Sequence, residues 1–238
     1  MVSKVTREDL SEAVNAVLDS VANNLSAHPD YQREMYKMTL DVLRSNNERL
    51  WFTICLRLGK IYQDLKNFEL LDSLLSELKE SCRTSSNTYD NSKANLLLEV
   101  FALEIQMCSM TKNNARMKAV YLETQKLSSV INDPRVVAII KETGGKIFMG
   151  EKKWHDALNE MFESFKNYQE IGNTRAKTVL KYVILASILS ASEIDYANTR
   201  EAKVYTDDPQ IQAIVLLRKA YEKNDINTIQ QILSNKNS

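Results

Sequence analysis

The 238-residue sequence has few of the residues that interrupt regular helices. It contains 5 glycines and 3 prolines, well below their average usage in globular proteins. It therefore has few of the residues that form the turns of β-sheets and the long loops between elements. Because 44% of its residues are hydrophobic, it can still bury a substantial core. This composition favours an all-helical protein.

The chain also lacks an excess of either charge. Its 31 basic and 31 acidic residues cancel, so no global field attracts nucleic acid or an anionic membrane. The longest purely apolar stretches, such as Val183 to Ala186, are far too short to span a bilayer. The N-terminus, Met1 to Thr6, has no apolar signal core. We therefore expect no nucleic-acid partner, no membrane partner and an intracellular location.

Residues suited to catalysis or metal binding are scarce. Cys55, Cys82 and Cys108 are widely spaced and form no CxxC pair, so we expect buried free thiols in a reducing compartment. The two histidines, His28 and His155, fit no metal-binding spacing and offer no base to activate a nucleophile. The sequence predicts no catalytic residue, no metal site and no cofactor, and therefore a protein that is not an enzyme.

One short pattern occurs twice along the chain. Gly59-Lys60-Ile61-Tyr62 recurs as Gly145-Lys146-Ile147-Phe148, and an aromatic residue, Phe68 or Trp154, follows each copy. A small residue in one helix, then a turn and a second amphipathic helix, is typical of a packed helical hairpin. Its repetition predicts a solenoid. Gly144-Gly145-Lys146 does not satisfy the phosphate-loop pattern, so close helix packing accounts better for these glycines.

The spacing of small residues sets the length of the repeat. Gly59, Ala102, Gly145 and Ala186 occupy comparable places in successive helical pairs, about 40 residues apart and longer than the ~34 of a tetratricopeptide unit. The fragment from Leu58 to Tyr62 matches the tetratricopeptide core, but a cysteine stands at the expected tryptophan position. We predict a right-handed α-solenoid of degenerate, tetratricopeptide-like hairpins.

We expect a single helical-repeat domain over residues 1–238, with about five or six helical pairs. A degenerate N-terminal pair covers 6–45, core repeats cover 48–192, and a terminal pair covers 208–234. The segment 193–208 between the last two is predicted to be a polar loop.

Basic side chains gather around two of the expected hairpin turns. If the repeats stack in register, they form a ridge that attracts an acidic partner or a polyphosphate. Acids such as Glu142 and Glu151 are interleaved with them, so ordinary solvated helix faces are the favoured alternative. The candidate partner-binding residues are Lys112, Arg116, Lys118, Lys141, Lys146, Lys152 and Lys153.

Longer motifs between Val14 and Asn235 carry a family resemblance. They are Leu50-Trp51-Phe52, the run from Leu98 to Met107, Lys112-Asn113-Asn114, Gly144-Gly145-Lys146, Phe162 to Tyr168, Lys181 to Ala186, Glu201 to Tyr205 before Asp208-Pro209, and Ala220 to Ile226. Together they resemble the subunit 2 family of the COP-nine signalosome, a PCI-domain family. The related proteasome-lid subunit fits the run from Leu98 and the loop around Glu201 less well.

The resemblance implies a non-catalytic scaffold. In that family a helical-repeat arm engages the cullin–RING ligase, and a PCI domain ending in a winged helix follows it. Zinc chemistry in another subunit removes the ubiquitin-like modifier from cullins. We therefore expect other signalosome subunits and cullin–RING ligases as partners, in the cytoplasm and nucleus.

The chain departs from the family pattern at both ends. We expect it to lack the acidic N-terminal tail, the first repeats and the winged helix. The N-terminal basic residues that contact cullin and inositol polyphosphate in the family are expected to be missing too, so no contact residue is carried over. Two alternatives stay open: a proteasome-lid scaffold, and a phosphate- or phosphopeptide-binding helical module that uses the lysine ridge.

Overall fold

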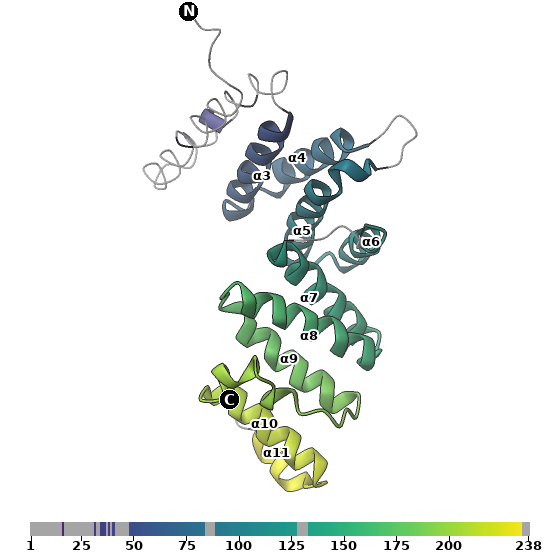
Figure 1. Cartoon of the computed structure of the whole chain (residues 1–238), viewed down its shortest axis with the longest axis vertical. Coiled ribbons are helices and arrows are strands. Elements are labelled where there is room, and N and C mark those ends of the chain that lie inside the picture. The colour runs from purple at the N-terminus through teal and green to yellow at the C-terminus, as the bar shows by residue number, and fades with distance from the viewer. Residues whose placement is uncertain are drawn as a thin grey trace, which may run out of the picture. The chain divides into compact units, whose positions relative to one another are not determined.

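A computed structural model describes residues 48–83, 89–127 and 133–234, together with residues 16, 31, 34–36, 38 and 40. Apart from one isolated β-bridge between Arg83 and Tyr89, the regular structure of these residues is helical (Figure 1). The predicted all-α helical solenoid class is therefore confirmed, whereas its handedness stays a prediction. The predicted pair over 6–45 lies mostly outside the described residues.

The chain divides into two compact units, residues 1–107 and 108–238, which are described separately. In the first unit, the described helices are α3 (Glu48–Asp64), α4 (Phe68–Ser81) and most of α5 (Ala94–Met110), which a short 3-10 turn (Asn91–Lys93) precedes.

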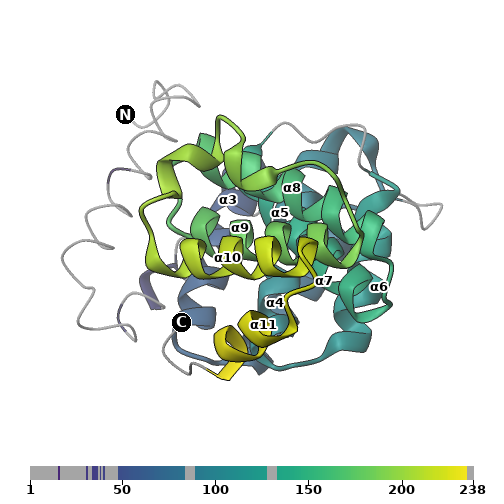
Figure 2. The same ribbon diagram turned by 90° about the horizontal axis from the view of Figure 1, so that it is seen from below.

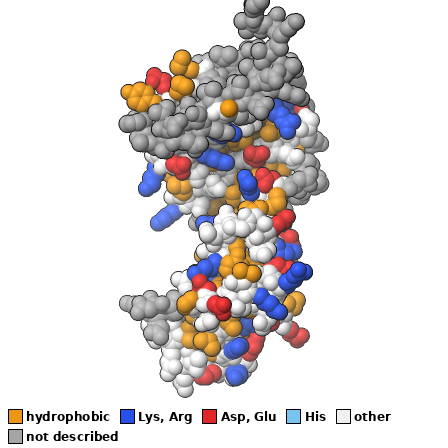
Figure 3. All heavy atoms as spheres, turned by 60° about the vertical axis from the view of Figure 1, so that its left-hand side comes forward, with side chains coloured by type: hydrophobic (Ala, Val, Ile, Leu, Met, Phe, Trp, Pro, Cys, Tyr) orange, Lys and Arg blue, Asp and Glu red, His pale blue; other side chains and the backbone are white. Residues whose placement is uncertain are grey.

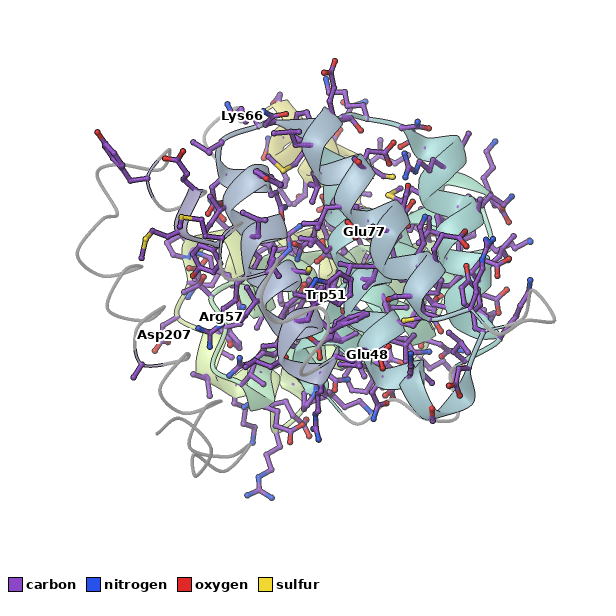
Figure 4. The ribbon with its side chains drawn as sticks, turned by 90° about the horizontal axis from the view of Figure 1, so that it is seen from above. Glu48, Trp51, Arg57, Lys66, Glu77 and Asp207 are labelled. Atoms are coloured by element: carbon purple, nitrogen blue, oxygen red, sulfur yellow. The ribbon has the colours of Figure 1, made fainter. Side chains whose placement is uncertain are left out.

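In the first unit, α3 is buried on most of its sides, whereas α4 buries a single stripe. Trp51 is 6% exposed. In Figure 4 it lies between Glu48, the first residue of α3, and Lys66, which lies in the turn after α3. The carboxylate of Glu104 on α5 is also buried, and Lys79 of α4 lies 3.0 Å from it. The buried members of the α4 stripe are Leu71, Leu74, Leu75 and Leu78.

The second unit stacks its helices in chain order, which is the arrangement expected of a solenoid. Helix α7 packs against both α6 and α8, α8 packs against α9, α9 against α10, and α10 against α11 (Figures 1 and 2). The helices are α6 (Asn114–Gln125), α7 (Pro134–Gly150), α8 (Trp154–Glu170), α9 (Arg175–Leu189), α10 (Pro209–Glu222) and α11 (Ile226–Ser234).

The turns that end most of these helices share one backbone geometry. One residue adopts a left-handed conformation, and the next N–H donates to the carbonyl five residues earlier at 2.9 Å. This hydrogen bond is that of the Schellman motif, which satisfies carbonyls at a helix end. Among the described residues, the left-handed positions are Lys66, Lys112, Lys152, Gly172, Ala191 and Asn224.

The close packing predicted at the repeated glycines is confirmed. A methyl group built on Gly145 would lie 2.6 Å from Cγ of Met161 on α8, and one built on Gly59 would lie 2.7 Å from a leucine side chain of α5. Both distances are shorter than carbon atoms tolerate. The two other positions predicted to share this register, Ala102 and Ala186, are buried as well.

The segment 193–208, predicted as a polar loop, contributes to the core of the second unit. Tyr196–Asn198 and Ala202–Tyr205 form short 3-10 turns. The ring centroid of Tyr196 lies 5.0 Å from that of Phe162 on α8, in an edge-to-face arrangement, which is favourable for aromatic pairs. This loop is therefore packed against α8 and α9 as part of the hydrophobic cluster.

Replacing Gly145 by leucine should lower the free energy of unfolding by about 1–3 kcal/mol, because overpacking a helix crossing forces side chains and backbone to shift. Chemical denaturation measures the change. Gly150→Leu is the matched control on the same helix, because nothing lies within 4 Å of a methyl group built there. Equal destabilisation by the two substitutions would contradict the close-packing account.

Candidate functional site

The seven candidate partner-binding residues all lie in the second unit. Lys112 occupies the turn between α5 and α6, and Arg116 and Lys118 lie in the first turns of α6. The other four belong to α7 or to the turn between α7 and α8; they are Lys141, Lys146, Lys152 and Lys153.

Backbone geometry places Lys112 and Lys152 at the tips of their turns. Their φ angles are 56° and 60°, a left-handed conformation that L-residues adopt at a cost of roughly 1–2 kcal/mol. Both side chains are exposed and make no ion pair within the described part of the chain. These two ammonium groups are therefore available to an acidic partner.

Glu151 forms ion pairs with two of these lysines, Lys118 and Lys153. Its Oε1 pairs with Lys118 of α6, and its Oε2 lies 2.7 Å from Nζ of Lys153. Hydrogen bonds from Lys118 and Lys153 lower the pKa of the Glu151 carboxyl to about 2. The first turns of α6 are thereby tied to the turn that joins α7 and α8.

Glu160 on α8 holds a second group of side chains. Its Oε1 lies 2.6 Å from Nζ of Lys141 on α7, and its Oε2 accepts a hydrogen bond of 3.2 Å from the Tyr121 hydroxyl on α6. Burial and the neighbouring Glu160 carboxylate raise the pKa of Tyr121. Lys141 therefore forms an ion pair that joins α7 to α8 within the protein.

Glu142 on α7 is the most buried of these carboxylates, with 4% of the residue exposed. The Arg175 guanidinium of α9 donates two hydrogen bonds of 2.7 Å to its two oxygens. Lys146 lies 2.6 Å from Oε1, and the Tyr168 hydroxyl of α8 donates to Oε2 at 3.1 Å. Burial raises the pKa of Glu142, but hydrogen bonds from Arg175 and Lys146 outweigh it and hold the pKa below its ordinary value.

The predicted ridge is therefore a surface of mixed charge. Figure 3 shows basic and acidic side chains interleaved on the visible face. Lys118, Lys141, Lys146 and Lys153 have carboxylate partners, and Arg116 is half-buried. The arrangement agrees with the interleaved acids noted in the sequence, and a partner-binding role for these residues stays a prediction.

The other candidate chemical groups are the cysteines and the histidines. The three cysteines are buried and free, as predicted, and burial raises the pKa of the Cys82 thiol. His155 is exposed at the start of α8, and His28 lies outside the described residues. Within the described ranges, no group of three or more His, Cys, Asp or Glu side chains could hold a metal ion. None of the helices described has the length and apolar character needed to cross a bilayer.

No family model matches the chain, but full sequences of known proteins do. It is 40% identical over 232 residues to COP9 signalosome subunit 2 of Drosophila melanogaster, a match to 97% of this chain and 52% of that protein. The Dictyostelium discoideum protein of the same name is 39% identical over the same shares of both chains. A 26S proteasome non-ATPase regulatory subunit 11, also of Dictyostelium discoideum, is 22% identical over 96% of this chain and 55% of its own length.

The chain thus spans about half the length of these relatives. The predicted resemblance to the COP-nine signalosome subunit 2 family is confirmed over nearly all of its residues.

Removing the Arg175 side chain should lower the free energy of unfolding by about 2 kcal/mol, because hydrogen bonds to a buried charge contribute about 1.5–3 kcal/mol. Arg175→Ala is compared with Lys126→Ala by urea denaturation. Lys126 directly follows α6 and pairs with Glu123 of the last turn, and both side chains are solvent-accessible, so its removal should change stability by less than about 0.5 kcal/mol. Similar effects of the two substitutions would show that the Glu142 network does not stabilise the second unit.

The contribution of Arg175 should also depend on pH. A carboxyl whose pKa is lowered on folding stabilises the folded state above its ordinary pKa, and the stabilisation is lost as the pH falls through the folded-state pKa. For Glu142 the ordinary value is 4.5. The difference in unfolding free energy between wild type and Arg175→Ala should be complete at about pH 6 and shrink below about pH 4.5. Denaturation curves across this range measure it, and a constant difference would contradict the assignment.

Proposed function

We propose that this chain, a homologue of COP9 signalosome subunit 2 over about half the length of that protein, is a non-catalytic scaffold of a signalosome-type complex. The observation that carries the proposal is the 40% identity to the Drosophila protein over 97% of the chain. The stacked hairpins of the second unit support it, because solenoids present extended surfaces for protein binding.

Its partners in this proposal are other signalosome subunits and a cullin–RING ligase. The helical arm holds the ligase while another subunit performs the deneddylation, in the cytoplasm and the nucleus. Lys112 and Lys152 are the candidate contacts with acidic partner surfaces, because their ammonium groups are exposed and have no ion pair within the described residues. Of the other five candidates, Lys118, Lys141, Lys146 and Lys153 already pair with carboxylates of the protein, and Arg116 is half-buried.

The proteasome regulatory relative supports a second candidate, a scaffold of the proteasome lid. That relative is 22% identical to the chain over 240 aligned residues. The lower identity makes this candidate the weaker of the two.

Binding assays with purified components separate the two candidates. The tagged 238-residue chain should retain signalosome subunits and a cullin–RING ligase on affinity resin, and should retain proteasome-lid subunits much less. Lys112→Glu combined with Lys152→Glu should weaken retention of the cullin–RING ligase, because like charges then face an acidic surface. Lys126→Glu combined with Lys219→Glu makes the same change in net charge at other exposed positions of the second unit and is the control.

Retention of lid subunits alone would replace the first candidate with the second. Isopeptidase activity of the purified chain would contradict the scaffold assignment in either complex.

A further inference from the structure

A pocket of about 590 Å³ lies in the second unit at the C-terminal ends of α9 and α10. The lining of one side comes from the end of α9 and the residues after it, including Ser192 and Glu193. The other side comes from the last turn of α10, including Arg218, Tyr221 and Glu222. Its volume is in the range of pockets that hold small ligands or a single large side chain.

The buried Arg218 side chain holds the two sides of the pocket together. It is 8% exposed. Its Nη1 donates to the Ile194 carbonyl at 2.8 Å, its Nη2 to the Ser192 carbonyl at 3.3 Å, and its Nε to Glu222 at 2.8 Å. A planar guanidinium with donors in three directions fixes the segment after α9 against α10. The pocket is therefore formed before any ligand binds.

The charge balance of the pocket is negative. Glu222 offsets the charge of Arg218, and Asp195 lies 3.5 Å from the same guanidinium. Glu193 is exposed and has no ion pair within the described residues. Helices α9 and α10 also both end here, and each helix C-terminus carries a partial negative charge. Neither Lys219 nor Lys223 of the same stretch lines the pocket.

The pocket also offers an aromatic surface to a cation. Tyr221 is 50% exposed, and its ring is a suitable face for a cation–π contact. Ile188 provides an apolar wall beside it. A carboxylate, a ring face and an apolar wall together match an arginine side chain, whose guanidinium pairs with carboxylates and stacks on rings while its methylene stem packs on apolar surface.

We propose that this pocket binds an arginine side chain of a protein partner. An anionic ligand would meet an unpaired carboxylate and two helix C-termini, which repel it. The described side chains of the pocket do not form a group that could hold a metal ion. This inference stands apart from the proposed complex, because it depends on the pocket alone.

The test uses the 238-residue chain and capped pentapeptides with one central residue flanked by alanines. Backbone amide NMR shifts are followed as each peptide is added. The arginine peptide should shift residues of the α9 and α10 ends and bind more tightly than the lysine peptide. The citrulline peptide, a neutral analogue of similar shape, should shift these residues far less.

Substitutions then assign the binding to the named side chains. Glu193→Gln should weaken binding of the arginine peptide about tenfold, because it removes a charge-assisted hydrogen bond. Tyr221→Leu should weaken it roughly threefold through loss of the cation–π contact. The matched control is Glu69→Gln at the exposed start of α4, which changes the net charge equally and should leave binding unchanged.

Three results would overturn the proposal. The first is equal binding of the arginine and citrulline peptides. The second is a set of shifts that lies away from the ends of α9 and α10. The third is the same loss of binding in Glu193→Gln and Glu69→Gln, which would mark a general attraction between charges.

Discussion

A buried carboxylate is stable only when cations and hydrogen-bond donors accompany it out of water. Glu142 meets this condition with donors from three consecutive helices: Lys146 of α7, Tyr168 of α8 and Arg175 of α9. Sliding α8 or α9 by one residue relative to α7 would remove its donor from the carboxylate. Apolar packing alone tolerates such rearrangement more readily. The register from α7 to α9, and with it the surfaces that their turns present, depends on this one group.

Most of the fold could be predicted from the sequence, because the signals involved are local. The apolar stripe from Trp154 to Tyr168 predicts α8, which ends two residues later at Glu170. Asp133 and Pro134 mark the start of α7, where the aspartate side chain accepts a hydrogen bond from the Arg135 N–H. Gly145 indicates a close helix crossing, and Met161 of α8 occupies it.

The state of the candidate site could not be predicted in the same way, because several of its ion pairs join distant positions. Two pairs are local: Glu142 with Lys146, one helical turn apart, and Glu151 with Lys153 in the following turn. Glu151 pairs with Lys118 across 33 positions, and Lys141 pairs with a glutamate 19 positions away. The pocket at the ends of α9 and α10 is equally hidden in the sequence. It forms where the C-terminal ends of α9 and α10 meet in space, although these ends are far apart in the sequence.

The turns with a left-handed residue have a further consequence for how this architecture varies. Their closure depends on main-chain hydrogen bonds, so the side chain at the tip has no part in it, and lysine, alanine, asparagine and glycine all occur there. All six tips described are exposed. The side chain at each tip can therefore be substituted without disturbing the main-chain hydrogen bonds of the turn. Such substitutions would change which partner the exposed tips bind while the helices keep their positions. Because the residue type at the tip varies, the sequence does not reveal this shared feature of the turns, which is the positive φ angle of one residue in each.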